Sequence, residues 1–259
     1  MPAVHFMDRA KKILGLAAKV LVYGFVFFIF LSLLPIFQPH STRAPKVKAK
    51  IEMIALVQAI ESYNAAYGHM PVSAAVQPAA HSGSFTYGAM IPNPKALGPI
   101  GTLVGGQVVM NSELIAVLMC ITNYPGQPRH AAINTNYCLN PQQTKFLNAS
   151  FVADGSLPGV GPDLVYRDPW GTPYVITISL SETNPCLDAF YGNQHFGQDQ
   201  SSKLGGSSGP TNSIGTGENE GLFQLRGHVM VWSAGPDKTV NASTPLDQAE
   251  NQDNVVSWR

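Results

Sequence analysis

The chain has 259 residues, enough for one domain together with a membrane element and long loops. Its 16 Lys and Arg residues balance its 16 Asp and Glu residues, so no basic patch points to a nucleic-acid partner. Only 12% of the residues are charged, against about a quarter in typical soluble domains. The polar surface must come from Ser, Thr, Asn, Gln, Gly and Pro, a composition common outside the cytoplasm.

An apolar run at residues 13–37 follows a short basic tip at residues 1–12. About 20 apolar residues cross the hydrocarbon core of a bilayer, so the run predicts a transmembrane helix in contact with membrane lipid. The alternative is a cleaved signal peptide, whose apolar region would be only about 7–15 residues long. Basic residues flank the run on both sides and leave its orientation open. The low content of charged residues in 38–259 favours an extracytoplasmic domain.

Residues 46–67 predict an amphipathic helix, because their apolar positions recur every three or four residues. Gly68 suits the end of this helix, and Pro71 prevents it from resuming. The apolar face is expected to lie on a sheet. A helix that docks into a partner filament would show the same pattern.

Residues 72–162 are rich in Pro, Gly, Ala and Ser and predict an irregular insertion. A short strand is expected near residues 107–110. A second helix is expected at 111–119, where Asn111 or Ser112 can cap the first turn.

The three cysteines match no zinc pattern. Cys120 and Cys138 are close enough in sequence to pair, which would leave Cys186 over, but spacing alone leaves a bridge and free thiols equally open. The histidines are scattered, without paired ligand spacing, and no phosphate-binding or dinucleotide motif occurs. We therefore expect no catalytic or cofactor-binding residues and no enzyme activity.

The segment Asp168–Tyr174 predicts a rigid turn that leads into a strand at residues 175–180. Two prolines fix the backbone, and Gly171 between them permits a tight turn. Trp170 is expected to be a buried plug, whose replacement by Ala costs about 3–5 kcal/mol. Further strands are expected at residues 222–226 and 228–233, after a linker-like stretch rich in Gly and Ser.

Four segments in this order carry a family resemblance: Asn64–Pro71, Asp168–Tyr174, Val231–Asp237 and Asp253–Trp258. The chain resembles the major pseudopilin of type II secretion systems and the broader type IV pilin-like family. The resemblance implies an α+β fold, with an N-terminal transmembrane helix and an amphipathic helix on a small antiparallel sheet with long loops. It assigns the sheet and a C-terminal loop to residues 168–259.

The chain departs from this family near its N terminus. The family has a processing site with a glycine, then Phe-Thr-Leu and a glutamate at the fifth mature position. Here Gly15 is followed by Leu16-Ala17-Ala18-Lys19-Val20, with neither phenylalanine nor glutamate. We therefore expect a pseudopilin-like domain on an unprocessed transmembrane anchor.

The resemblance also implies a calcium ion in the C-terminal loop, with ligands at Asp237 and Asp253 and at nearby backbone oxygens. Calcium takes six to eight hard oxygen ligands, and Asn241, Asp247, Glu250 and Asn251 add oxygens of this kind to the loop. The alternative is that these Asp and Asn residues only cap turns.

The sequence therefore favours a structural subunit for protein secretion or pilus-like assembly, which associates with itself or with other pseudopilins. The expected location is the bacterial inner membrane, single-pass, with the C-terminal domain in the periplasm. The alternative function is an anchored extracytoplasmic binding module that does not polymerise.

Overall fold

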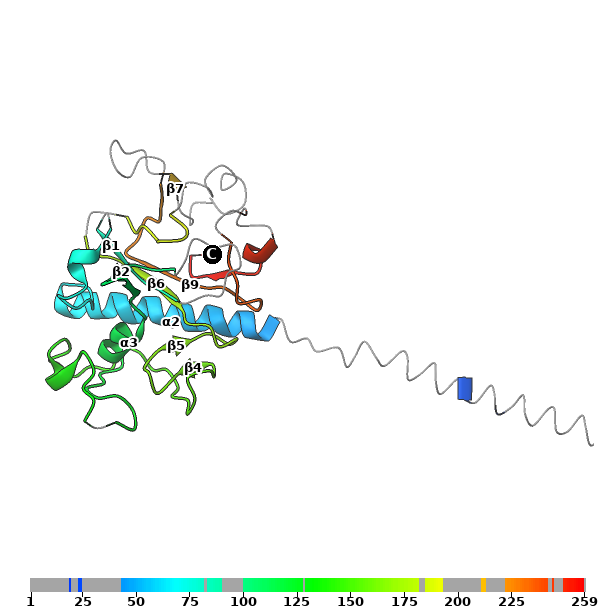
Figure 1. The fold of residues 1–259 in the computed structure, drawn as a ribbon, viewed down its shortest axis with the longest axis horizontal. Helices are drawn as coiled ribbons and strands as arrows, with labels where there is room; N and C mark the ends of the chain where they lie inside the picture. The colour runs from blue at the N-terminus through cyan, green and yellow to red at the C-terminus, as the bar shows by residue number, and fades with distance from the viewer. Residues whose placement is uncertain are drawn as a thin grey trace, which may run out of the picture. The chain divides into compact units, whose positions relative to one another are not determined.

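The computed structural model describes residues 19, 23–24, 43–81, 83–89, 100–127, 129–181, 185–192, 211–212, 222–241, 244 and 249–258. The chain divides into two compact units, Met1–Arg43 and Ala44–Arg259. The fold described below is that of the second unit (Figure 1).

Two helices and ten short strands make up the described secondary structure. The helices are α2 (Arg43–Tyr67) and α3 (Ser112–Leu118), and short 3₁₀ turns lie at Gln77–Ala79, Thr135–Tyr137 and Ala249–Asn251. The strands are β1 (Ser84–Tyr87), β2 (Leu103–Val104), β3 (Gln107–Val108), β4 (Gly159–Val160), β5 (Tyr166–Arg167), β6 (Val175–Ser179), β7 (Thr211–Asn212), β8 (Phe223–Gln224), β9 (Val229–Ser233) and β10 (Val255–Val256).

The main sheet has four antiparallel strands in the order β1-β6-β9-β10. In the register, Phe85 lies opposite Ile178, and Trp232 lies between Val175 and Val256. Three two-stranded ladders, β2-β3, β4-β5 and β7-β8, surround it. Strands far apart in sequence thus meet in one sheet.

Both faces of the main sheet are buried, each under its own apolar cluster. Ile176 and Ile178 of β6 belong to the cluster shared with α2 and α3, whereas Val175 belongs to the cluster on the other face. In β9, Val231 and Trp232 divide in the same way. Because successive strand residues point to opposite faces, all five residues of β6 and of β9 are buried.

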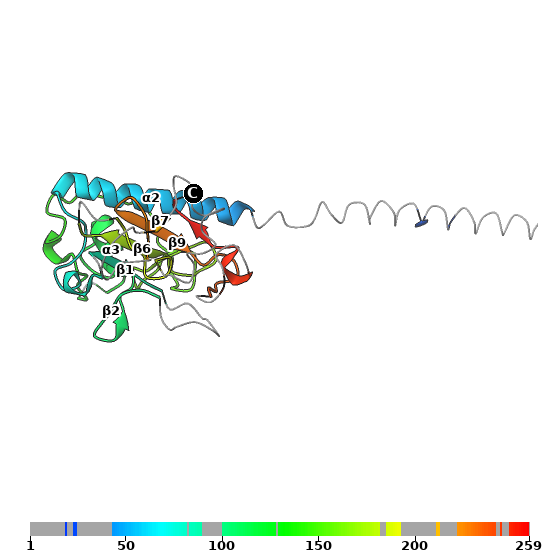
Figure 2. The ribbon, with the colours of Figure 1, turned by 90° about the horizontal axis from the view of Figure 1, so that it is seen from above.

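Helix α2 lies along one side of the sheet (Figure 2). Its buried positions include Met53, Leu56 and Ile60, which share one face at helical spacing. The helix begins three residues before the expected start, because Pro45 is tolerated in the first turn of a helix. It ends at Tyr67. Gly68 follows with a φ of 71°, and its amide donates to the Asn64 carbonyl at 2.7 Å.

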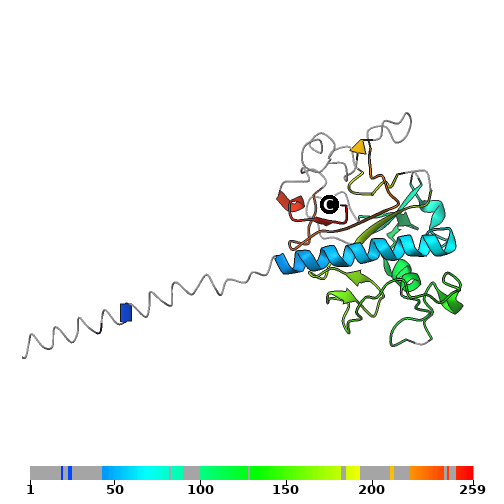
Figure 3. The same cartoon turned by 180° about the vertical axis from the view of Figure 1, so that it is seen from behind.

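Polar contacts hold α2 on two sides. Lys50 donates from Nζ to the Val256 carbonyl of β10 at 2.7 Å. Glu52 accepts a hydrogen bond from the Tyr174 hydroxyl at 2.6 Å. In Figures 1 and 3, β4 and β5 lie on one side of the helix and the C-terminal strand on the other. The orientation of the helix about its own axis is therefore fixed.

The turn at residues 168–172 is built around the buried carboxylate of Asp168. Its Oδ1 accepts hydrogen bonds from the amides of Trp170 and Thr172, both at 2.9 Å. Its Oδ2 accepts one from the Ser233 hydroxyl at the end of β9. Burial raises the pKa of Asp168, while these hydrogen bonds act in the opposite direction.

Trp170 differs from the expectation of a buried plug. It packs against the main cluster but remains partly exposed, and the fully buried indole of this region is that of Trp232. The two prolines and Gly171, with a φ of 88°, shape the turn, and the carboxylate fixes it.

The apolar run at residues 13–37 lies almost entirely outside the described residues. Among those that are described, no helix is both long and apolar enough to cross a membrane. The long helix, α2, carries charged side chains along its length: Arg43, Lys46, Lys48, Lys50, Glu52 and Glu61. This finding contradicts the predicted α+β fold with an N-terminal transmembrane helix. It also contradicts the single-pass inner-membrane location that rested on that helix.

The region expected to be an irregular insertion, 72–162, contributes to the main sheet. It contains β1, which forms one edge of the sheet through four residue pairs with β6. It also contains α3, whose buried residues join the main cluster. The insertion is therefore partly structural.

We expect Asp168→Ala to lower the free energy of unfolding by about 3 kcal/mol or more. Each hydrogen bond to a charged acceptor contributes about 1.5–3 kcal/mol, and the substitution leaves two amides and a hydroxyl without their acceptor. Urea unfolding measures this loss. The matched variant Trp170→Ala should cost less than the range of about 3–5 kcal/mol for a fully buried Trp. A larger loss from Trp170→Ala than from Asp168→Ala would contradict this account of the turn.

Candidate functional site

The loop between β9 and β10 begins and ends at the same end of the sheet, because these strands are antiparallel neighbours. Its two arms meet at Gly235, which has a φ of 74°. A Cβ at this position would lie 2.5 Å from the Asp253 carbonyl oxygen and 3.1 Å from Asp253 Oδ1. Only glycine fits there, since both the backbone conformation and the space exclude a side chain.

The two predicted metal ligands lie on opposite arms of this loop and interact electrostatically. Burial raises the pKa of Asp253, and the negative charge of Asp237 raises that pKa further. Asp253 Oδ1 is buried and has no hydrogen-bond partner. Asn254 Oδ1, on the adjacent residue, is also buried without a partner. Asp237 is exposed and accepts a hydrogen bond from the Thr239 amide at 2.9 Å.

Asn251 holds the middle of the loop together. Its Oδ1 accepts from the Asn241 amide at 2.9 Å, and its Nδ2 donates to the carbonyls of Asn241 and Thr244, both at 2.8 Å. Asn241 also donates to Glu250 Oε2 at 3.5 Å. Asn241 and Glu250, both predicted to add oxygens to the loop, are therefore hydrogen-bonded to each other. Asp247 lies outside the described residues.

The donor set suits a hard cation. Among the residues with described positions, no three or more His, Cys, Asp or Glu side chains form a metal-binding cluster. A cation at Asp237 and Asp253 would thus be held by two carboxylates together with neutral oxygens, from amides, backbone carbonyls or water. Calcium accepts such a mixture. The unpartnered buried oxygens of Asp253 and Asn254 are consistent with this chemistry.

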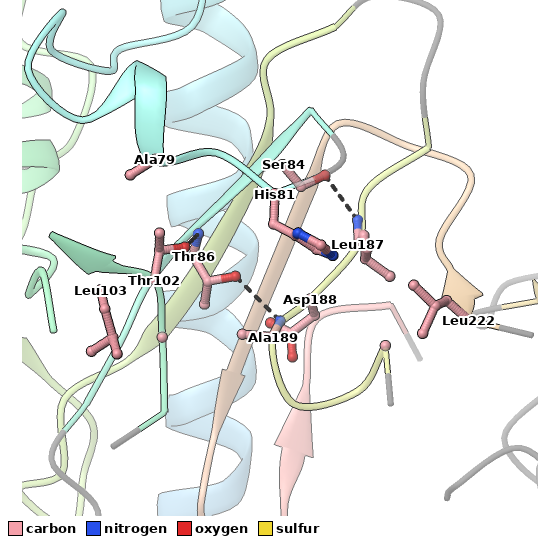
Figure 4. Close-up of a pocket in the computed structure, with 12 residues that line it drawn as sticks. Ala79, His81, Ser84, Thr86, Thr102, Leu103, Leu187, Asp188, Ala189 and Leu222 are labelled. Carbon is pink, nitrogen blue, oxygen red and sulfur yellow. Dashed lines mark hydrogen bonds between the residues drawn. The ribbon is translucent and has the colours of Figure 1, made fainter. Parts of the chain in front are cut away.

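A cavity of about 620 Å³ lies beside β1 (Figure 4). Its lining includes His81, Ser84, Thr86, Thr102 and Asp188. The Ser84 hydroxyl accepts from the Leu187 amide at 3.0 Å. The hydroxyls of Thr86 and Thr102 are likewise bonded to protein groups.

Asp188 is a buried residue in the lining of this cavity, and its carboxylate accepts four hydrogen bonds. Its Oδ1 accepts from the amides of Phe190 and Tyr191 at 2.9 and 2.8 Å. Its Oδ2 accepts from the Thr177 hydroxyl and from Trp232 Nε1, the latter at 3.1 Å. A carboxylate with every lone-pair direction in use is a structural group rather than a general base.

Among the described residues, His81 lines the cavity with Ser84 and Asp188, but no three or more His, Cys, Asp or Glu side chains come together as a metal-binding group. His228 Nδ1 lies 3.7 Å from Glu61 Oε2, at the far end of α2. All three cysteines are free: Cys120 is partly exposed, Cys138 exposed and Cys186 buried. The Cys120–Cys138 bridge that the sequence left open is therefore not formed.

The sequence predicts Asp237 and Asp253 as ligands and names Asn251 only as an oxygen donor, whereas in the structure Asn251 closes the loop through its own hydrogen bonds. Asp188 had no signal in the sequence, since its donors come from β6, β9 and its own turn.

No family model matches the chain, and neither curated proteins nor solved structures gave a match.

The raised pKa of Asp253 predicts a pH dependence in cation-free protein. The folded state holds this proton more tightly than the unfolded state, so stability falls as pH rises from about 4, the ordinary Asp value, through the raised folded pKa. Asp237→Asn removes one cause of the shift and should reduce the fall. Urea unfolding in a calcium chelator, between about pH 4 and 6, measures it.

Glu61→Gln is the matched control, because Glu61 is a partly exposed carboxylate outside this loop. It should leave the fall attributed to Asp253 in place. An unchanged pH dependence in Asp237→Asn would show that the two carboxylates do not interact.

Proposed function

We propose that this chain is a structural subunit of the pseudopilin-like kind, which assembles through its helix for protein secretion or pilus-like assembly. Its partners are further copies of itself or other pseudopilin-like subunits. The observation that carries the proposal is an uncovered apolar face on α2. The likeness to pseudopilins is one of motifs and arrangement, so it is an argument by analogy.

The apolar stripe consists of Val47, Ile51 and Ile54, whose side chains are 58%, 62% and 42% exposed. Their spacing places them on one face of the helix, away from the buried face that contains Met53 and Leu56. Figure 3 shows α2 with its outer face uncovered along its length. Single exposed apolar residues are normal, but a contiguous row on a fixed helix is typical of an interaction surface.

The turn and the C-terminal loop support the same proposal. In the resembled family, a turn of this sequence leads into the sheet, and an acidic loop follows the last long strand. Here Asp168 ties that turn to Ser233, directly before the loop. The turn and the C-terminal loop are thus parts of one connected region.

Asp237 and Asp253 would hold the calcium ion, with nearby backbone oxygens as neutral donors. The bound cation would supply positive charge between two carboxylates that otherwise repel each other. These residues would then fix the end of the sheet, where β10 also contacts α2 through Lys50.

Calcium should raise the unfolding temperature of the full chain. A ligand at about one hundred times its Kd stabilises the folded state by about 2.7 kcal/mol. Thermal unfolding with and without calcium measures the shift. Asp253→Ala should abolish it, whereas Glu61→Gln, at a partly exposed carboxylate outside the loop, should retain it. A wild-type protein whose unfolding temperature ignores calcium has no such site.

The full chain should self-associate, and Ile51→Glu should weaken this association by placing a charge on the apolar stripe. Sedimentation velocity over a concentration series measures it. Ala66→Glu adds the same charge at another exposed position of α2 and is the matched control. Wild-type protein that remains monomeric would contradict the proposal.

The second candidate is a binding module that does not polymerise, and the cavity beside β1 is the observation that favours it. Sedimentation separates the two functions, since a monomer at all concentrations is the expected result for a binding module.

A further inference from the structure

A second apolar surface lies on the segment around β4, remote in sequence from α2. Phe151 and Leu157 are 52% and 46% exposed. With the three residues of the apolar stripe, they form most of the large apolar side chains that are exposed in the described structure. We call these two residues the hairpin patch, because they directly precede the hairpin formed by β4 and β5.

The hairpin patch is held rigidly by its own backbone. The Val152 amide donates to the Val160 carbonyl at 2.9 Å, and the Val160 amide donates to the Ser150 carbonyl at 3.0 Å. Asp154 Oδ1 accepts from the Ser156 amide at 2.8 Å, which closes the turn between the two apolar residues. The apolar side chains therefore stay exposed on an ordered support.

The two surfaces carry opposite charge. Asp154 lies between Phe151 and Leu157, and hydrogen bonding to Ser156 lowers its pKa, with a smaller effect from Arg167. The apolar stripe is flanked by Lys48, whose side chain is 57% exposed and whose ammonium group lies 3.8 Å from Glu52 Oε1 of the same helix. The hairpin patch, with its carboxylate, is therefore complementary in charge to the apolar stripe, with its ammonium group, and both surfaces are apolar at their centre.

Within one copy the two surfaces do not cover each other, because all five side chains remain between 42% and 62% exposed. Glu52 faces Tyr174, directly after the turn that follows β5. Ile51 precedes it by one residue and so points about 100° away around the helix. Contact between stripe and patch therefore requires two molecules.

We propose that the hairpin patch of one copy packs on the apolar stripe of the next, with Asp154 facing Lys48. This inference rests on the proposed function and names the surfaces that meet. Because the two surfaces differ, each added copy leaves one stripe and one patch uncovered. Such a head-to-tail contact propagates into a ring or a filament.

Site-directed cross-linking tests the pairing. Cys120 and Cys138 are first replaced by Ala in the full chain, because they are the accessible thiols, while Cys186 is buried. Ile51→Cys and Leu157→Cys are then made separately and treated with a short bismaleimide. Covalent dimers are expected from the mixture of the two variants and not from either alone. Dimers from Ile51→Cys alone would show a symmetric contact between stripes and overturn the proposal, as would no dimers in the mixture.

A charge exchange provides the second measurement. Lys48→Asp and Asp154→Lys should each weaken self-association, and the combination should restore it. Leu157→Glu should raise the Kd of self-association by about tenfold or more. Leu103→Glu, at another exposed leucine, is the matched control.

The outcomes separate this contact from the proposed function. If the wild type associates and Ile51→Glu blocks association while Leu157→Glu does not, assembly through the helix stands and the hairpin contact is wrong. If the wild type does not associate, both fail.

Discussion

The hydrogen bond between Ser233 and Asp168 connects the two halves of the second unit. Asp168 closes its own turn through two backbone amides, and its other oxygen receives the hydroxyl at the end of β9. The same hydroxyl oxygen accepts the Gly235 amide at 3.0 Å. Gly235 in turn lies against Asp253. The position of the C-terminal loop thus depends on a turn about 65 residues earlier, because the network is buried and its members share atoms.

A second buried carboxylate has a similar role on the other face of the sheet. Asp188 receives the Thr177 hydroxyl from β6 and the Trp232 indole from β9. It thereby orders the segment that covers the aromatic cluster of Phe190, Tyr191 and Trp232. Every carboxylate oxygen of both acids accepts a hydrogen bond. A buried polar group that is satisfied in this way specifies one packing arrangement and does not weaken the fold. The two faces of the sheet are each fixed by one acid.

Parts of this fold could be predicted from the sequence, because their signals are local. The spacing of apolar residues gave helix α2, and strands β6 and β9 followed from β-branched residues next to turn signals. Strand β1 could not be predicted. Its four residues lie in a region rich in Gly and Pro, and all of them are buried, so no alternation distinguishes them.

The candidate site was half predictable for the same reason. Asp237 and Asp253 came from a motif, whereas the close approach of Gly235 to Asp253 depends on how the two arms of the loop pack. Trp170 was assigned to the core on its size alone, and its partial exposure follows from the placement of the turn at the edge of the cluster. The transmembrane helix rested on hydropathy within one run, and no described helix has that character.

Strand β10 pairs with β9 through two residue pairs, and the Val256–Lys50 and Ser257–Val231 hydrogen bonds add to this attachment. Short terminal strands with few contacts open at a lower free energy than the strands they join. The amide hydrogens of this strand should therefore exchange with solvent by local opening, before the β6–β9 pair separates. Since Asp253 and Asn254 immediately precede β10, the loop and the strand would detach together as one cooperative segment. Strand β10 is thus the part of the sheet whose order depends most directly on the loop that precedes it.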